Sequence, residues 1–114
     1  MPKVLISDAM DSVAQKILSS NNIQVDEKTD FEPDELIKNI QSYDGLIVRS
    51  ATKVTKEVID NGKKLKIIGR AGAGVDNIDL NAAKVKKVIV MNTPGGNTNA
   101  TAEHTLALLL SLSR

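Results

Sequence analysis

The sequence predicts an α/β fold built on one parallel β-sheet, and three observations support this prediction. Short, continuous apolar runs of Val, Ile and Leu recur along the chain, as expected of strands buried on both faces. Between them lie segments whose apolar residues repeat at helical spacing. The chain has 114 residues, enough for one domain with its own core. Strands and helices that alternate in this way form right-handed βαβ units and a parallel sheet.

The first half of the chain predicts three strands and two helices. Residues 3–7 contain an apolar run typical of a buried strand, and a weaker run follows at residues 23–25. Residues 11–20 between them carry apolar residues on one helical face. A second helix begins near Pro33, whose ring suits the first helical turn, and it ends before a third strand at residues 45–48.

The second half predicts two more strands. A short helix at residues 55–61 precedes a strand at residues 65–68. A further helix at residues 80–86, with Asp79 as its N-cap, precedes the fifth strand at residues 88–91. Five strands without long excursions predict the flavodoxin-like order 2-1-3-4-5, with helices on both faces.

The C-terminal segment, residues 98–114, predicts a helix that is apolar on nearly every side. Such a helix is normally buried between layers, and one small sheet cannot cover it completely. We therefore expect residues 1–97 to form the flavodoxin-like domain and residues 98–114 to contact a second domain or a second copy of the chain.

The composition excludes several classes of function. Fifteen Lys and Arg residues are balanced by 14 Asp and Glu residues, so no basic surface for nucleic acid or an anionic membrane is expected. There is no cysteine, which excludes disulfides and thiolate metal sites. Asp76 and Asp79 lack further ligands at metal spacing and are expected to order a loop and cap a helix. Without a membrane-spanning run or a signal-peptide pattern, we expect a cytoplasmic protein.

A glycine-rich turn, with Gly69, Gly72 and Gly74, follows the fourth strand. Glycines before a helix bring main-chain N–H groups close to an anion, and Arg70 adds a positive charge. A turn without a ligand and a dinucleotide site are the alternatives. The dinucleotide pattern is incomplete, because Asn77 occupies the third glycine position and no acidic residue ends a strand about 20 residues further on.

Several of these polar segments fall at the carboxyl ends of predicted strands. They are Asp8, Arg49 with Ser50, residues 70–74 and residues 92–97. Ligands of open α/β sheets bind beyond this edge, so we expect the four segments to lie along one edge. For Asp8, a role in capping its loop is favoured over a role as an acid or phosphoacceptor.

Four segments together identify a resemblance to a known family. They are KVLISD at 3–8, GLIVRSATKVT at 45–55, GRAGAGVDNIDL at 69–80 and VMNTPGGN at 90–97. In register, they resemble the opening segment of the NAD-dependent D-isomer-specific 2-hydroxyacid dehydrogenases, in particular members that oxidise 3-phospho-D-glycerate to 3-phosphooxypyruvate in serine biosynthesis. Residues 102–110 are similar to the family's helix that leads from the substrate domain into the cofactor domain.

The resemblance implies roles for residues at the predicted edge. Arg49 and Ser50 match the positions that bind the substrate phosphate, and a guanidinium with a hydroxyl suits phosphate oxygens. Ala71 and Gly72 match main-chain donors to the substrate carboxylate. Arg70, beside them, is expected either to pair with substrate charge or to brace the loop.

The resemblance also implies a cofactor contact and a missing part. Ala73 matches a position near the nicotinamide of NAD, and Asn97 matches a substrate-side amide. The family's catalytic Arg, Glu and His have no counterpart among these 114 residues, so we expect no catalytic residue and no turnover from this chain alone. A second domain or a homo-oligomeric contact is expected at the 98–114 helix. Lys87 stands where the family usually has a glycine in a left-handed conformation.

Two other functions remain open at this point. A phosphoacceptor module has the same topology, but it needs an Asp at the end of the third strand, where this chain has Arg49. A non-catalytic assembly module would use the 98–114 helix as its interface.

Overall fold

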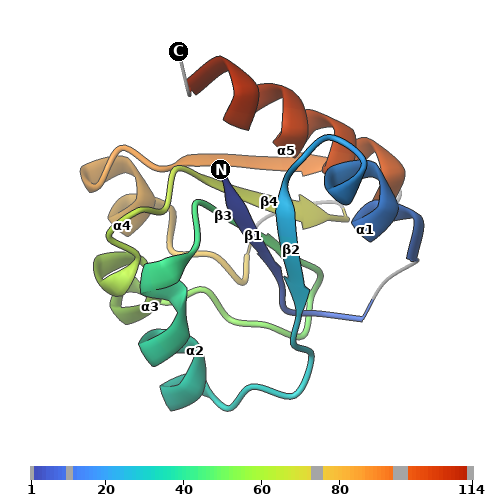
Figure 1. Ribbon diagram of the computed structural model, residues 1–114. Coiled ribbons are helices and arrows are strands. Elements are labelled where there is room, and N and C mark those ends of the chain that lie inside the picture. The colour runs from blue at the N-terminus through green and yellow to red at the C-terminus, as the bar shows by residue number, and fades with distance from the viewer. Residues whose placement is uncertain (1, 10–11, 73–75, 94–97, 113–114) are drawn as a thin grey trace.

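The computed structural model describes residues 2–9, 12–72, 76–93 and 98–112. Its five-stranded sheet is parallel throughout and has the order β2-β1-β3-β4-β5, which confirms the predicted topology (Figure 1). The strands are β1 (Lys3–Ile6), β2 (Gln24–Glu27), β3 (Gly45–Val48), β4 (Ile67–Ala71) and β5 (Ile89–Thr93).

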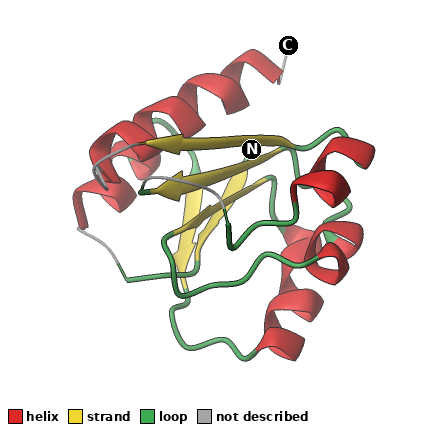
Figure 2. Ribbon diagram, turned by 180° about the vertical axis from the view of Figure 1, so that it is seen from behind, coloured by secondary structure: helices red, strands yellow, loops and turns green. Residues whose placement is uncertain are grey.

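Helices cover both faces of the sheet, as Figures 1 and 2 show. The helix α1 (Ser12–Ser19) and the helix α5 (Thr98–Leu112) lie on one face. The opposite face carries α2 (Pro33–Asn39), the short 3-10 helix η1 (Ile40–Ser42), α3 (Lys56–Asn61) and α4 (Leu80–Val85). None of the helices in the described ranges combines the length and the apolar character needed to cross a lipid bilayer.

The strand residues alternate between two apolar cores, because successive side chains of a strand point to opposite faces. In β1, Val4 and Ile6 pack towards α1 and α5, whereas Leu5 packs towards α2, α3 and α4. Both faces of the central strands are therefore buried. This explains why these strands are continuous apolar runs in the sequence.

The helix α5 packs directly on the sheet with one side. Ala102 and Leu109 on that side are fully or almost fully buried, whereas Leu110 is 46% exposed. Close approach is possible because Gly69 in β4 has no side chain: a Cβ there would lie 3.0 Å from Thr105 Oγ1 and 3.1 Å from Thr101 Cγ2. The α5 side away from the sheet thus keeps exposed apolar surface.

Three strands extend further at their carboxyl ends than predicted: β2 reaches Glu27, β4 reaches Ala71 and β5 reaches Thr93. The pairing of β4 with β5 continues through Arg70–Asn92 and Ala71–Thr93. Arg70 and Ala71 are therefore strand residues, and the glycine-rich turn begins only at Gly72. Periodicity missed this extension because it is set by pairing with the neighbouring strand rather than by apolar residues.

Candidate functional site

The described polar segments lie along one edge of the sheet, as predicted. Asp8 follows β1, Arg49 follows β3, and β4 and β5 end at Ala71 and Thr93. Val48, the last residue of β3, pairs with Arg70 of β4. Arg49, the next residue, therefore lies level with Ala71 of β4, and neighbouring strands are about 4.8 Å apart. The edge thus brings together residues far apart in the chain, such as Asp8 and Arg49, which are separated by 41 positions.

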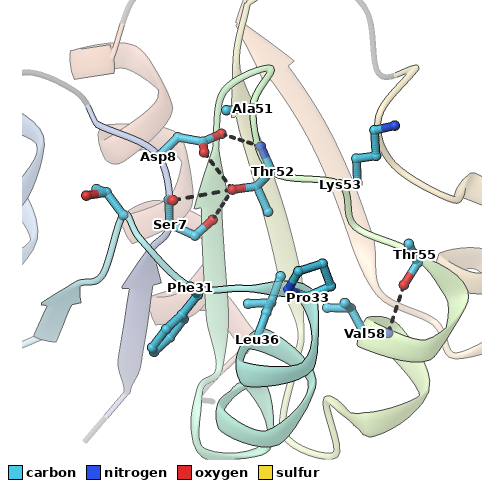
Figure 3. Close-up of a pocket in the computed structure, with 11 residues that line it drawn as sticks. Ser7, Asp8, Phe31, Pro33, Leu36, Ala51, Thr52, Lys53, Thr55 and Val58 are labelled. Carbon is cyan, nitrogen blue, oxygen red and sulfur yellow. Dashed lines mark hydrogen bonds between the residues drawn. The ribbon is translucent and has the colours of Figure 1, made fainter.

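Asp8 organises the loop that follows β3. Its side chain is buried, and Oδ2 accepts hydrogen bonds from the N–H of Arg49 at 2.7 Å and of Thr52 at 3.0 Å. Oδ1 accepts from the Thr52 hydroxyl at 2.6 Å (Figure 3). This confirms the predicted capping role of Asp8. A carboxylate held by three donors is poorly placed to act as a phosphoacceptor.

Asn77 holds the same loop from the other side. Its Nδ2 donates to the carbonyl of Arg49 at 2.8 Å and to that of Thr52 at 2.7 Å. Main-chain bonds between Val54 and the segment 77–79 join the two loops further along. In the sequence, Asn77 stands out only as a residue in place of a glycine. The residues next to it in the chain do not indicate that its partners lie 25 and 28 positions away.

Arg49 and Ser50 are exposed in this loop. The Arg49 guanidinium makes a long contact, 3.5 Å from Nη1 to the carbonyl of Ala9, which leaves most of its donors facing solvent. Ser50 lines a shallow groove of about 550 Å³ between its own loop and the segment 76–79. Both residues thus present donors at the surface, as binding of an external anion requires.

Arg70 is buried, in contrast to Arg49. Its side chain is 11% exposed, and Nη1 donates to Asp76 Oδ1 at 2.7 Å. This bond from Arg70 holds the pKa of the Asp76 carboxyl below its ordinary value. This bond fits the expected bracing role of Arg70, and its pairing with substrate charge stays a prediction. Its Nε–H is buried without a hydrogen-bond partner among the described residues and lies beside Gly72.

Gly72 has φ 152°, a conformation that favours glycine. Its N–H donates to the Thr93 carbonyl at 3.0 Å, and its own carbonyl accepts a 3.4 Å bond from Asn92 Nδ2. The N–H of Gly72 is thus engaged within the sheet edge rather than open to a ligand. Ala73 and Asn97, the remaining predicted contacts, lie outside the described residues.

A separate pocket of about 340 Å³ lies on the α2 side of the loop (Figure 3). Its lining combines an apolar group with polar residues of the β1 and β3 loops, including Phe31, Leu36, Val58, Thr52 and Lys53. Among the described residues, none of the predicted substrate contacts lines it. The pocket and the predicted site share the loop that separates them, and Asp8, which holds Arg49 in that loop, also lines the pocket.

The described residues of the turn before α4 do not fit the phosphates of a dinucleotide. The Asp79 side chain caps α4 by accepting from the N–H of Ala82 at 3.0 Å, so a carboxylate already occupies the place an anion would take. Asn77 is likewise committed to the neighbouring loop. Within the described ranges, no group of three or more His, Asp or Glu side chains is arranged to hold a metal ion.

Comparison with known proteins identifies the class to which this fold and edge belong. Residues 4–110 match the catalytic domain of the D-isomer specific 2-hydroxyacid dehydrogenases, and the chain belongs to this family.

Curated proteins similar to this chain include D-3-phosphoglycerate dehydrogenases. The chain is 53% identical over 112 residues to that of Sus scrofa and 48% identical over 112 residues to that of Archaeoglobus fulgidus. Each alignment covers 98% of this chain but 21% of the relative. The chain thus spans about a fifth of the length of the curated relatives it matches.

Solved structures of similar proteins have the same fold as this chain. A structure of 3-phosphoglycerate dehydrogenase from Entamoeba histolytica with bound NAD+ matches with a TM-score of 0.75 and 37% identity, over 95% of this chain and 38% of that one. The PH0520 protein from Pyrococcus horikoshii matches with a TM-score of 0.78 and 35% identity, over 98% of this chain and 33% of that one.

Proposed function

We propose that this chain is the substrate-binding part of a D-3-phosphoglycerate dehydrogenase, which oxidises 3-phospho-D-glycerate to 3-phosphooxypyruvate with NAD. Family membership and the relatives named above support the proposal. The observation that carries it is the exposed Arg49–Ser50 pair, held by Asp8 and Asn77 beside the end of β4. A positively charged fork at this edge suits a small phosphorylated acid.

The ligand would carry an anionic group at each end. Arg49 and Ser50 would bind the phosphate, because a guanidinium donates two parallel hydrogen bonds and a hydroxyl adds a third. The carboxylate would lie near Ala71 and Gly72, one strand away, where the unpartnered Nε–H of Arg70 offers a buried donor. The Gly72 N–H is bonded to the Thr93 carbonyl and would have to break that bond to donate to the ligand. Gly72 would instead contribute by letting the ligand come close to the main chain, because it has no side chain. Asn97 is proposed as a further amide contact.

NAD, when bound, accepts the hydride from C2 of the substrate. Ala73 is the proposed contact of this chain with the nicotinamide, and we propose that another part of a longer protein holds most of the cofactor. We propose that the catalytic Arg, Glu and His lie there too, so that these 114 residues alone would bind substrate without turning it over. We propose the cytoplasm as the location.

The division into a domain of residues 1–97 and a connecting helix is also a proposal. The exposed apolar side of α5, which includes Leu110, supports contact with a cofactor domain or with a second subunit.

Isothermal titration of the chain with 3-phosphoglycerate tests the proposed substrate. We expect weak binding that weakens further with added salt, and Arg49→Ala should reduce the affinity at least about tenfold because it removes charge-assisted bonds. Lys64→Ala, which removes an exposed charge before β4 at the opposite edge, is the matched control and should bind like the wild type. Absence of binding, or an Arg49→Ala variant indistinguishable from wild type, would remove Arg49 and Ser50 from the site.

A further inference from the structure

Residues 49–52 form a short loop whose two end residues are held by side chains from elsewhere in the fold. Arg49 and Thr52 each direct their N–H to the Asp8 carboxylate and their carbonyl to the Asn77 amide. Asp8 comes from the end of β1, and Asn77 comes from the segment before α4. All four main-chain polar groups of the loop's ends are therefore satisfied by two side chains.

We propose that Asp8 and Asn77 are positioning residues for phosphate binding. They would fix the loop so that the Arg49 guanidinium and the Ser50 hydroxyl point to one place beyond the sheet edge. The proposal rests on the proposed function, and it adds two residues that act through Arg49 and Ser50 rather than by touching the substrate.

The physical reason is the cost of ordering an exposed loop. Ser50 and Ala51, between the two held residues, are exposed, so burial in the core does not fix them. A loop free to move would lose its conformational freedom when it closes on an anion, and that loss subtracts from binding. Hydrogen bonds at both ends restrict the loop before the ligand arrives.

The charges of the two side chains are also suited to an anion site. A free carboxylate beside the phosphate would repel it. Asp8 is buried and directs its oxygens to three donors, which keeps its charge inside the loop. Asn77 donates from a neutral amide and adds no negative charge where the loop's carbonyls gather.

A double-mutant cycle with 3-phosphoglycerate as the probe tests the proposal. The affinities of the wild type, Asn77→Ala, Arg49→Ala and the double variant are measured by NMR titration, and thermal unfolding is followed in parallel. We expect Asn77→Ala to weaken binding about tenfold when Arg49 is present and less than about twofold when it is absent. Asn81→Ala, an exposed residue on α4, is the matched control and should not change the affinity.

The outcomes separate this inference from the proposed function. If the wild type does not bind, or if Arg49→Ala is silent, the proposed function fails and the inference fails with it. If Arg49→Ala weakens binding but Asn77→Ala does not, or weakens it equally in both backgrounds, Asn77 is merely structural and the inference alone is overturned. If Asn77→Ala does not fold, Asp8→Asn replaces it in the double-mutant cycle with Arg49→Ala, and the same outcomes support or overturn the inference.

Discussion

Lys87 follows α4 in the left-handed conformation, with φ 60°. The sequence predicted this strained position from its resemblance to a family that usually has glycine there. Asn22 adopts φ 65° after α1, but asparagine tolerates this conformation better than lysine does. The two positions form a natural comparison, because both residues are exposed and each lies before a strand of the sheet.

We expect Lys87→Gly to raise the free energy of unfolding by about 0.5–1 kcal/mol, because it relieves the contact between Cβ and the main chain. Asn22→Gly should gain less than half of this. Urea unfolding would measure both as shifts of the midpoint at constant slope. Equal gains at the two positions, or a loss at Lys87, would contradict the explanation.

The roles of the site residues could be predicted from the sequence to different extents. The capping role of Asp8 could be predicted because it directly follows a buried strand. The role of Asn77 could not, since its partners are 25 and 28 residues away and only the folded loops bring them together. Arg70 was predicted with two possible roles: its 2.7 Å bond to Asp76 fits the bracing role, and its pairing with substrate charge stays a prediction.

Among the elements, the contact of α5 with β4 depends on small and hydroxyl-bearing residues. Thr101 and Thr105 are fully buried against the sheet. The Thr101 hydroxyl shares a hydrogen bond with Thr93 of β5, whereas the Thr105 hydroxyl lies over Gly69 without a hydrogen-bond partner among the described residues. Burial of an unpaired hydroxyl is unfavourable.

We expect Thr105→Val to stabilise the protein by about 1 kcal/mol, because a methyl group replaces an unpaired hydroxyl of similar size. Thr101→Val is the matched control: it removes a hydroxyl that is bonded and should destabilise by about 1 kcal/mol or more. Thermal and urea unfolding of both variants would check the opposite signs. Destabilisation by Thr105→Val would mean that its hydroxyl contributes to stability.

The sequence predicted which strands exist more accurately than it predicted where each strand ends. Apolar runs located all five strands, since the sheet buries both faces, and the strand Gly45–Val48 was predicted without error. The carboxyl ends of β2, β4 and β5 were placed too early, because polar residues such as Glu27, Arg70 and Thr93 lie there and join the sheet through pairing. Patterns of apolar residues contain no signal for such an extension.

At the scale of the whole molecule, one edge of the sheet gathers the loops that could receive a ligand. Arg49 and Ala71 come together there because β3 and β4 are neighbours in register, and strand order is a property of the complete fold. The pocket beside Phe31 lies next to the same loop but has a more apolar lining. We propose that this edge, and not the pocket, binds the phosphorylated acid.

An NMR titration of the 15N-labelled chain with 3-phosphoglycerate tests this claim most directly, because chemical shifts report even weak binding residue by residue. We predict saturable shifts of the main-chain amides of Arg49, Ser50, Ala71 and Gly72, with much smaller shifts in an equal titration with D-glycerate. Shifts confined to Phe31, Leu36 and Val58, or no saturable shift at all, would contradict the account.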